Sequence, residues 1–102
     1  MLTIDEIKER IAPLCREYEI DRAFLFGSYA RGDATEDSDV DIRIENHSPK
    51  LRTLLQVGEL LGHMEAALQK RVDLLTSLPT DDWSFIFRKN VLKDEVLIYE
   101  TR

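Results

Sequence analysis

The sequence predicts an α/β (α+β) domain in which helices pack on a mixed β-sheet of about four strands. Three observations support this fold class. The chain has 102 residues, near the common size of one domain, and its 43% apolar and 33% charged residues are typical of a globular protein. Helical and strand-like periodicities alternate along it in the order α-β-(short α)-β-α-β-α-β. No internal repeat or linker interrupts that order, so residues 1–102 are expected to form a single domain.

The first helix is predicted from a capping box and an apolar stripe. Thr3 and Glu6 have the spacing of a capping box. Apolar residues then recur at intervals of three and four, at Ile4, Ile7, Ile11, Leu14 and Tyr18. Pro13 lies inside this pattern and removes the hydrogen bond to Glu9, so a bend or an early end of the helix is expected.

Two strands with a brief helical turn between them are predicted next. Residues 22–26 form a short apolar run that stops at Gly27, which indicates a buried strand. Residues 29–32 are expected to form a helical turn, and residues 33–38 a polar loop. Val40, Ile42 and Ile44 then alternate with polar residues, which is the period of a strand.

The second half of the chain repeats the helix and strand patterns. Ser48 followed by Pro49 predicts the start of a helix. Its packing face is expected at Leu54, Val57, Leu61, Met64 and Leu68. Residues 71–76 indicate a third strand, Thr80 or Asp81 can cap a last helix, and residues 96–99 indicate a terminal strand. The last helix would carry Trp83, Ile86 and Phe87.

Charge and composition exclude several classes of function. A net charge of −6 disfavours direct nucleic acid binding, which needs a basic face. No apolar run reaches the ~20 residues of a membrane span, and the N-terminus lacks a basic-then-apolar signal pattern. The one cysteine, Cys15, cannot form an internal disulfide and is expected to be a buried apolar residue in a reducing cytoplasm.

Three acidic residues in predicted strands are the candidates for metal binding. Asp39 and Asp41 are two apart on one strand, so their side chains should share a face; an isolated Asp-x-Asp pair is otherwise ordinary surface decoration. Asp73 interrupts an apolar strand, where a charge needs compensation. If the two strands are neighbours, three carboxylates converge, and two charges ~4 Å apart repel by about 4 kcal/mol at an effective dielectric near 20. Oxygen ligands of this kind suit Mg²⁺ or Mn²⁺ together with substrate phosphates.

The turn after the first predicted strand is the candidate phosphate site. Gly27 lets the backbone approach an anion closely, and the hydroxyl of Ser28 can donate to a phosphate oxygen. Arg31 has two equally supported roles, adding positive charge to a triphosphate or bracing the loop through nearby acids such as Asp33. Gly32 is expected to adopt a special backbone angle in this turn.

These residues resemble the signature of a known superfamily. The run from Gly27 to Gly32, followed by Ser38-Asp39-Val40-Asp41, resembles that of the DNA polymerase β-like nucleotidyltransferases. Within it, the chain is similar to the minimal nucleotidyltransferases (MNT), the antitoxins of MNT/HEPN toxin–antitoxin pairs. Residues 71–74 and 96–99 also resemble the later strands of this family, so the resemblance covers nearly the whole chain.

The resemblance implies a role for each candidate residue. Asp39 and Asp41 would bind the metal ions, and Asp73 would complete one metal site and help activate the attacking hydroxyl. Gly27 and Ser28 would hold the β- and γ-phosphates, with Arg31 at the family's arginine position. The reaction would transfer AMP from ATP to a hydroxyl, in MNT/HEPN pairs a tyrosine of the HEPN ribonuclease toxin. The short chain leaves no room for an acceptor-binding domain, so a partner protein would supply the acceptor.

Two other functions remain open from the sequence. The chain could inhibit a toxin by binding alone, or transfer the nucleotide to a small-molecule hydroxyl. The aromatic residues Trp83, Phe85 and Phe87 fit either a core or a patch for a helical partner. The oligomeric state, a homodimer included, is not determined by the sequence.

Overall fold

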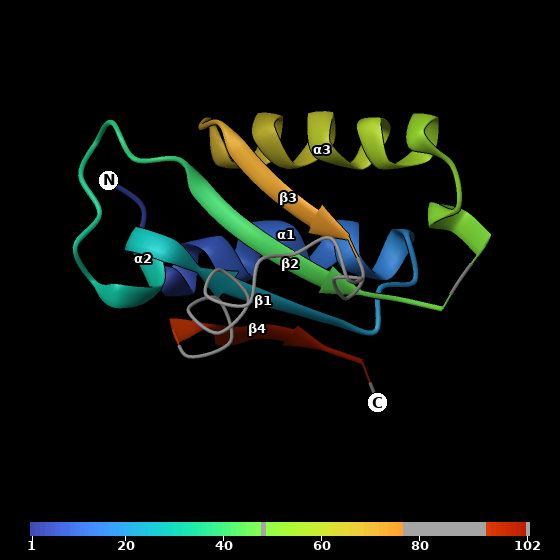
Figure 1. Cartoon of the computed structure of the whole chain (residues 1–102), viewed down its shortest axis with the longest axis horizontal. Coiled ribbons are helices and arrows are strands. Elements are labelled where there is room, and N and C mark those ends of the chain that lie inside the picture. The colour runs from blue at the N-terminus through green and yellow to red at the C-terminus, as the bar shows by residue number, and fades with distance from the viewer. Residues whose placement is uncertain (48, 77–93, 102) are drawn as a thin grey trace, which may run out of the picture.

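Within the described residues, one mixed sheet of four strands organises the structure (Figure 1). This computed structural model describes residues 1–47, 49–76 and 94–101. The sheet order is β3-β2-β1-β4; β1 is antiparallel to β2 and β4, whereas β2 and β3 are parallel. The predicted mixed sheet is therefore confirmed. The strands are β1 (Arg22–Phe26), β2 (Val40–Glu45), β3 (Val72–Thr76) and β4 (Val96–Glu100).

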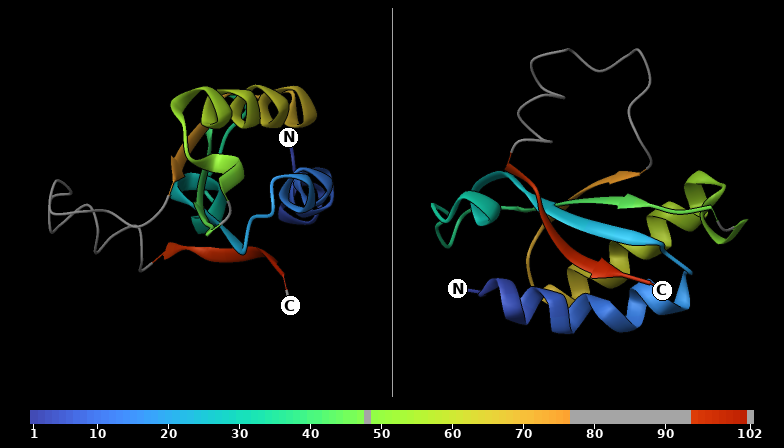
Figure 2. Two further views of the ribbon diagram at one scale, coloured as in Figure 1. Left: turned by 90° about the vertical axis from the view of Figure 1, so that its right-hand side faces the viewer. Right: turned by 90° about the horizontal axis from the view of Figure 1, so that it is seen from below.

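The two long helices cover one face of this sheet. Figure 2 shows α1 (Ile4–Glu17) and α3 (Leu54–Leu68) side by side on the same side of the strands. The five-residue α2 (Gly27–Arg31) follows β1 directly, and a single 3-10 turn, η1 (Pro49–Leu51), precedes α3. Because side chains alternate along a strand, every second residue of β1 and β2 faces the two helices.

The core lies between the helices and the sheet. The helices contribute Ile7, Ile11, Cys15, Leu60, Met64 and Leu68 to it. The strands contribute Ala23, Leu25, Val40, Ile42, Ile44, Val72 and Ile98. The residues of β2 between the buried ones, Asp41 and Arg43 among them, therefore point to the opposite face.

The start of α1 agrees with the prediction, and its end does not. Thr3 and Glu6 form both hydrogen bonds of the predicted capping box. The helix continues past Pro13 to Glu17, so the predicted early end is wrong. Pro13 is exposed, and one lost hydrogen bond does not outweigh the burial of Ile7, Ile11 and Cys15 on the other face.

The start and the packing face of α3 differ from the prediction. Pro49 belongs to the 3-10 turn, and the α-helix begins at Leu54 after a capping box between Thr53 and Gln56. In this box the Thr53 hydroxyl accepts from the Gln56 N–H at 3.1 Å. The fully buried face is centred on Leu60, Met64 and Leu68, whereas Leu54, predicted to pack, is 90% exposed. At about 100° per residue Leu54 lies only about 40° around the helix from the buried Leu68, so its exposure follows from its place in the first turn of α3 rather than from its side of the helix.

Some predictions fall on residues that the structure does not describe. The predicted last helix with Trp83, Ile86 and Phe87, the aromatic residue Phe85 and the predicted helix cap Ser48 lie outside the described ranges. In the part of the chain that is described, no helix has the length and apolar character needed to cross a membrane.

Candidate active site

A tight turn between β1 and α2 forms one side of the candidate site. Gly27 starts α2, two residues before the predicted helical turn, and has a φ of +73°. A Cβ atom at this position would lie 2.2 Å from Oδ2 of Asp41. Only glycine combines this left-handed backbone with so close an approach to a carboxylate. The predicted special backbone angle at Gly32 is confirmed by its φ of +85° at the end of α2.

The three predicted acids come from two neighbouring strands. Asp41 is the second residue of β2 and Asp73 the second residue of β3, and the two are directly paired in the parallel ladder. Asp39 precedes β2 by one residue. The prediction that the strand of Asp73 lies beside that of Asp39 and Asp41 is confirmed. Because paired residues of neighbouring strands project to the same face, Asp41 and Asp73 share the face that points away from α1 and α3.

Electrostatics within this group are unfavourable for three ionised acids. Burial, and after it the negative charges of Asp73 and Asp39, raise the pKa of Asp41 from 3.8 to about 6, while the positive charge of Arg31 acts to lower it. Asp39 and Asp73 are exposed, and Asp41 is half-buried against the Gly27 turn. A carboxylate in this position gains from any cation that binds beside it.

The donor set fits a divalent cation that also contacts a phosphate. Among residues 1–47, 49–76 and 94–101, no three His, Cys, Asp or Glu side chains surround a common point that could hold a metal ion. In the described arrangement, Asp39, Asp41 and Asp73 therefore do not all surround one ion. Mg²⁺ is usually held by one or two carboxylates together with waters and substrate phosphates. Asp41 with one neighbouring acid, beside the Gly27 turn, matches that smaller requirement.

Arg31 lies next to the acids and makes two ion pairs. Its Nε lies 3.3 Å from Oδ2 of Asp33, and its Nη1 lies 3.9 Å from Oδ2 of Asp94. The bracing role is thus the one for which the structure provides contacts. The side chain is 47% exposed, so these surface pairs do not prevent it from turning toward a phosphate.

Sequence reasoning missed one charged residue beside the acids, the buried Arg43. Its side chain donates from Nε and Nη2 to the two carboxylate oxygens of Glu95 at 3.0 and 2.9 Å, and from Nη1 to Glu45 at 2.8 Å. The guanidinium also stacks on the ring of Phe24, 4.4 Å from its centroid. Burial lowers the pKa of Arg43, but the hydrogen bonds to Glu95 and Glu45 raise it overall. Nothing in the local alternation of β2 distinguishes Arg43 from an exposed strand residue.

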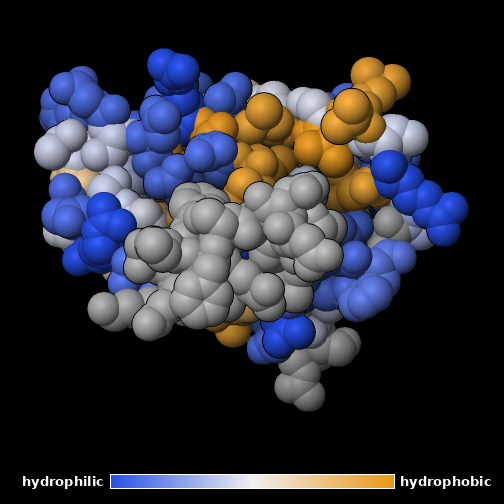
Figure 3. Space-filling model, viewed as in Figure 1, coloured by the Kyte–Doolittle hydropathy of each residue, from blue (hydrophilic) through white to orange (hydrophobic). Residues whose placement is uncertain are grey.

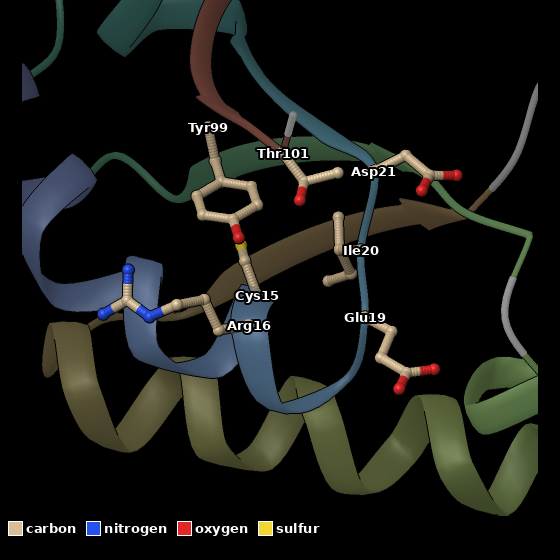
Figure 4. A pocket seen from close by; sticks show the side chains of 7 residues that line it. All are labelled: Cys15, Arg16, Glu19, Ile20, Asp21, Tyr99 and Thr101. Atoms are coloured by element: carbon tan, nitrogen blue, oxygen red, sulfur yellow. The ribbon is translucent and has the colours of Figure 1, made fainter.

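A pocket at the other end of β1 has no comparable chemistry. Its volume is about 240 Å³, and Figure 4 shows Asp21, Tyr99 and Thr101 around it with Cys15 at its base. Burial raises the pKa of the Cys15 thiol to about 12, so the thiol is neutral and unreactive at physiological pH. Cys15 is fully buried, as predicted, and acts as a small apolar residue.

The replacement Gly27→Ala should damage both stability and nucleotide use. The added methyl group meets Asp41 Oδ2 at 2.2 Å and requires a φ of +73°, so we expect a loss of at least about 2 kcal/mol in the free energy of unfolding. Urea unfolding measures this loss, and the melting-temperature shift caused by Mg²⁺ and ATP measures nucleotide binding. Gly32→Ala is the matched control, because its φ of +85° causes similar strain but no atom of the described residues lies within 4 Å of the new Cβ. Equal nucleotide binding by both variants would show that the contact between Gly27 and Asp41 does not matter for the site.

The comparison with protein families identifies one matching model. Residues 9–102 match the family described as polymerase beta, nucleotidyltransferase. A candidate protein adenylyltransferase of Methanocaldococcus jannaschii is 41% identical over 75 residues, which cover 74% of this chain and 78% of the relative. The protein adenylyltransferase MntA of Thermococcus cleftensis is 39% identical over 79 residues, with the same shares of the two chains.

Solved structures share the fold. A candidate minimal nucleotidyltransferase superposes with a TM-score of 0.71 at 29% identity, over 94% of this chain and 96% of that chain. A chain from the complex of a tri-AMPylated Shewanella oneidensis HEPN toxin with its MNT antitoxin superposes with a TM-score of 0.65. The latter match covers 93% of this chain and 71% of the other at 22% identity, and shows similarity of fold only.

Proposed function

Because this chain belongs to the polymerase beta nucleotidyltransferase family, we propose that it transfers AMP from ATP to a hydroxyl of a partner HEPN ribonuclease and thereby acts as its antitoxin. The acceptor hydroxyl in this proposal is a tyrosine of the partner. The observation that carries the proposal is the pairing of Asp41 with Asp73 directly beside the Gly27 turn. Relatives named as protein adenylyltransferases support a protein as the acceptor.

Each candidate residue has a defined task in this reaction. The backbone at Gly27 and the hydroxyl of Ser28 bind the β- and γ-phosphates, and Arg31 adds positive charge when it leaves Asp33. Asp39, Asp41 and Asp73 would hold Mg²⁺ or Mn²⁺, and the ion would supply positive charge that neutralises the triphosphate. The bond between the acceptor oxygen and the α-phosphorus forms, the bond from that phosphorus to the bridging oxygen breaks, and pyrophosphate leaves. In this proposal Asp73, which is exposed on β3, accepts the proton of the acceptor hydroxyl.

The setting proposed for this reaction follows from the chain as a whole. We take residues 1–102 to be one minimal nucleotidyltransferase domain, of which the family match covers residues 9–102. The unpaired, buried Cys15 fits a reducing cytoplasm. The net charge of −6 favours a basic protein partner over nucleic acid.

The proposed transfer is tested with ATP labelled at the α-phosphate, Mg²⁺, the purified chain and a HEPN ribonuclease from the same genome. We expect label on the HEPN protein, and at least about a hundredfold less with Asp39→Asn combined with Asp41→Asn, because loss of metal ligands removes several kcal/mol of transition-state stabilisation. Asp5→Asn, an exposed acid in the first turn of α1, is the matched control and should label normally.

Two other results would replace the proposal. Full neutralisation of the toxin in cells by the double variant would show that binding suffices and that the chain inhibits by occlusion. Label on small hydroxylated compounds with none on the HEPN protein would identify a small-molecule transferase instead.

A further inference from the structure

Two consecutive acids, Asp94 and Glu95, precede β4 and pair with two arginines near the candidate site. Leu25 of β1 pairs with Val96 of β4, so by continuation of this antiparallel register the chain before β4 runs beside the end of β1 and the start of α2. Figure 1 and the right-hand view of Figure 2 both show the start of β4 next to α2. The two acids therefore lie beside the turn at Gly27, across β1 from the strand β2.

Glu95 is firmly held on the sheet. Its two carboxylate oxygens accept hydrogen bonds from Nε and Nη2 of Arg43 at 3.0 and 2.9 Å. Arg43 follows Asp41 by two residues on β2, so the two side chains project to the same face of the sheet. Arg43 is buried, and a bidentate pair of this kind fixes the orientation of both partners. Glu95 thus ties the start of β4 to the strand that carries Asp41.

Asp94, the neighbour of Glu95, pairs with Arg31 at the end of α2. Its Oδ2 lies 3.9 Å from Nη1 of Arg31, which makes an ion pair without a hydrogen bond. Nε of the same guanidinium lies 3.3 Å from Oδ2 of Asp33. The side chain of Asp33 is 63% exposed in the loop after α2, whereas that of Asp94 is 28% exposed and follows the chain held by Glu95. Of these two acids, Asp94 is the one whose position the sheet determines.

The guanidinium of Arg31 retains donors for a ligand. A guanidinium carries five N–H groups in a rigid plane and stays charged at physiological pH. Among the residues that the structure describes, Nη2 of Arg31 has no hydrogen-bond or ion-pair partner. Figure 3 shows hydrophilic residues on the visible face over α2 and the loop after it, in contrast to the apolar surface over α3. A phosphate oxygen can therefore take a hydrogen bond from Nη2 while Nη1 stays with Asp94.

We propose that Asp94 is a positioning residue, which holds Arg31 beside the Gly27 turn so that Nη2 donates to the triphosphate. This inference rests on the proposed function. Asp94 itself does not touch the nucleotide; it acts through Arg31, and the pair of Glu95 with Arg43 keeps it in place. When the nucleotide binds, Arg31 leaves the exposed Asp33 and keeps Asp94.

Asp94 has two effects on nucleotide binding, and they have opposite signs. Its negative charge repels the triphosphate, so removal of that charge would tighten binding if repulsion were the only effect. Solvent and salt screen charges at the surface, which keeps this repulsion small. Without Asp94, the nucleotide alone must order the long side chain of Arg31, and ordering such a side chain is entropically costly. We therefore expect the loss of positioning to outweigh the loss of repulsion.

Asp94→Asn tests the positioning role, with the affinity for ATP in the presence of Mg²⁺ measured by titration calorimetry. We expect the affinity to fall about fivefold, the equivalent of one ion pair near the surface. In the labelling assay KM for ATP should rise while kcat stays nearly unchanged, and Asp94→Glu, which keeps the carboxylate, should restore most of the affinity. Asp33→Asn is the matched control, because it removes an acid beside the same guanidinium, and it should bind ATP as tightly as wild type or more tightly.

A double-mutant cycle shows whether Asp94 acts through Arg31. In a chain that already carries Arg31→Ala, Asp94→Asn should cause no further loss of affinity for ATP. A loss that persists without Arg31 would overturn the proposal. Tighter binding by Asp94→Asn, or an equal loss in Asp33→Asn, would overturn it as well.

The failure of this inference can be told apart from the failure of the proposed function. If the wild type transfers label to the HEPN protein and Asp94→Asn binds ATP as tightly as wild type, the positioning role is wrong and the proposed function stands. If the affinity for ATP depends on Asp94 through Arg31 but no label is transferred, the proposed function fails and the positioning role stands. A wild-type chain that binds no ATP would overturn both.

Discussion

Asp41→Asn should reduce AMP transfer at least about a hundredfold and yet make the metal-free protein more stable. The carboxylate of Asp41 is held in a half-buried position against Gly27 beside two other acids, and its pKa is raised to about 6. A raised carboxyl pKa means that ionisation destabilises the folded state, and this cost is fully present above the folded pKa. Asparagine removes the charge, so the gain at pH 7 is on the order of 1–2 kcal/mol after allowance for solvent screening.

The pH dependence of this gain is its own control. As the pH falls from 7 through 6 toward 4, the wild-type carboxyl takes up its proton and the difference between wild type and variant should shrink. Urea unfolding in the presence of EDTA at several pH values measures it. A variant that is less stable than wild type at pH 7 would contradict a repulsive cluster.

Arg43→Met should cause the largest loss of stability, about 3 kcal/mol or more in the free energy of unfolding. Arg43 is 2% exposed, and methionine leaves the carboxylate of Glu95, 14% exposed, without its bidentate partner. Removing one member of a buried ion pair is more costly than the pair is worth, because the other charge stays desolvated. The carboxylate of Glu45 keeps a charged partner in this variant, because Arg22 Nε lies 3.0 Å from its other oxygen.

A double variant distinguishes the buried charge from lost packing. Arg43→Met with Glu95→Gln should recover much of the loss in urea unfolding, because no unpaired charge remains. Arg10→Met, which breaks the exposed pair of Arg10 with Glu6 at 3.9 Å, should be far milder. If the double variant is no more stable than Arg43→Met alone, the ion pair is not the cause.

The sequence predicted the strands and the acids because both depend on local patterns. The alternation through Val40, Ile42 and Ile44 determines which residues of β2 face the helices, and it sends Asp41 to the other face. From the sequence, Asp41 and Asp73 were expected to converge only if their two strands were neighbours. The structure has the two strands side by side and parallel, as is usual when a helix connects them.

What could not be predicted depends on residues distant in the chain. Arg43 and Glu95 are 52 residues apart, and no periodicity marks either as half of a buried pair. The helix stripe at intervals of three and four included Leu54, because spacing alone does not show where the sheet stops covering the helix. Thr53 and Gln56 form the only capping box at the observed start of α3, but Ser48-Pro49 gave a competing signal earlier.

Asp41 and Asp73 come together only after the chain has crossed from β2 through α3 to β3, so we expect this pair to form late in folding. β1 and β2 are antiparallel neighbours joined by residues 27–39, which include α2, whereas Asp73 reaches Asp41 only when β3 has docked in parallel after the longer connection through α3. Separation of β3 from β2 would take Asp73 away from Asp41. A protein that bound along that edge would therefore hold the pair of carboxylates together as well as being modified by it.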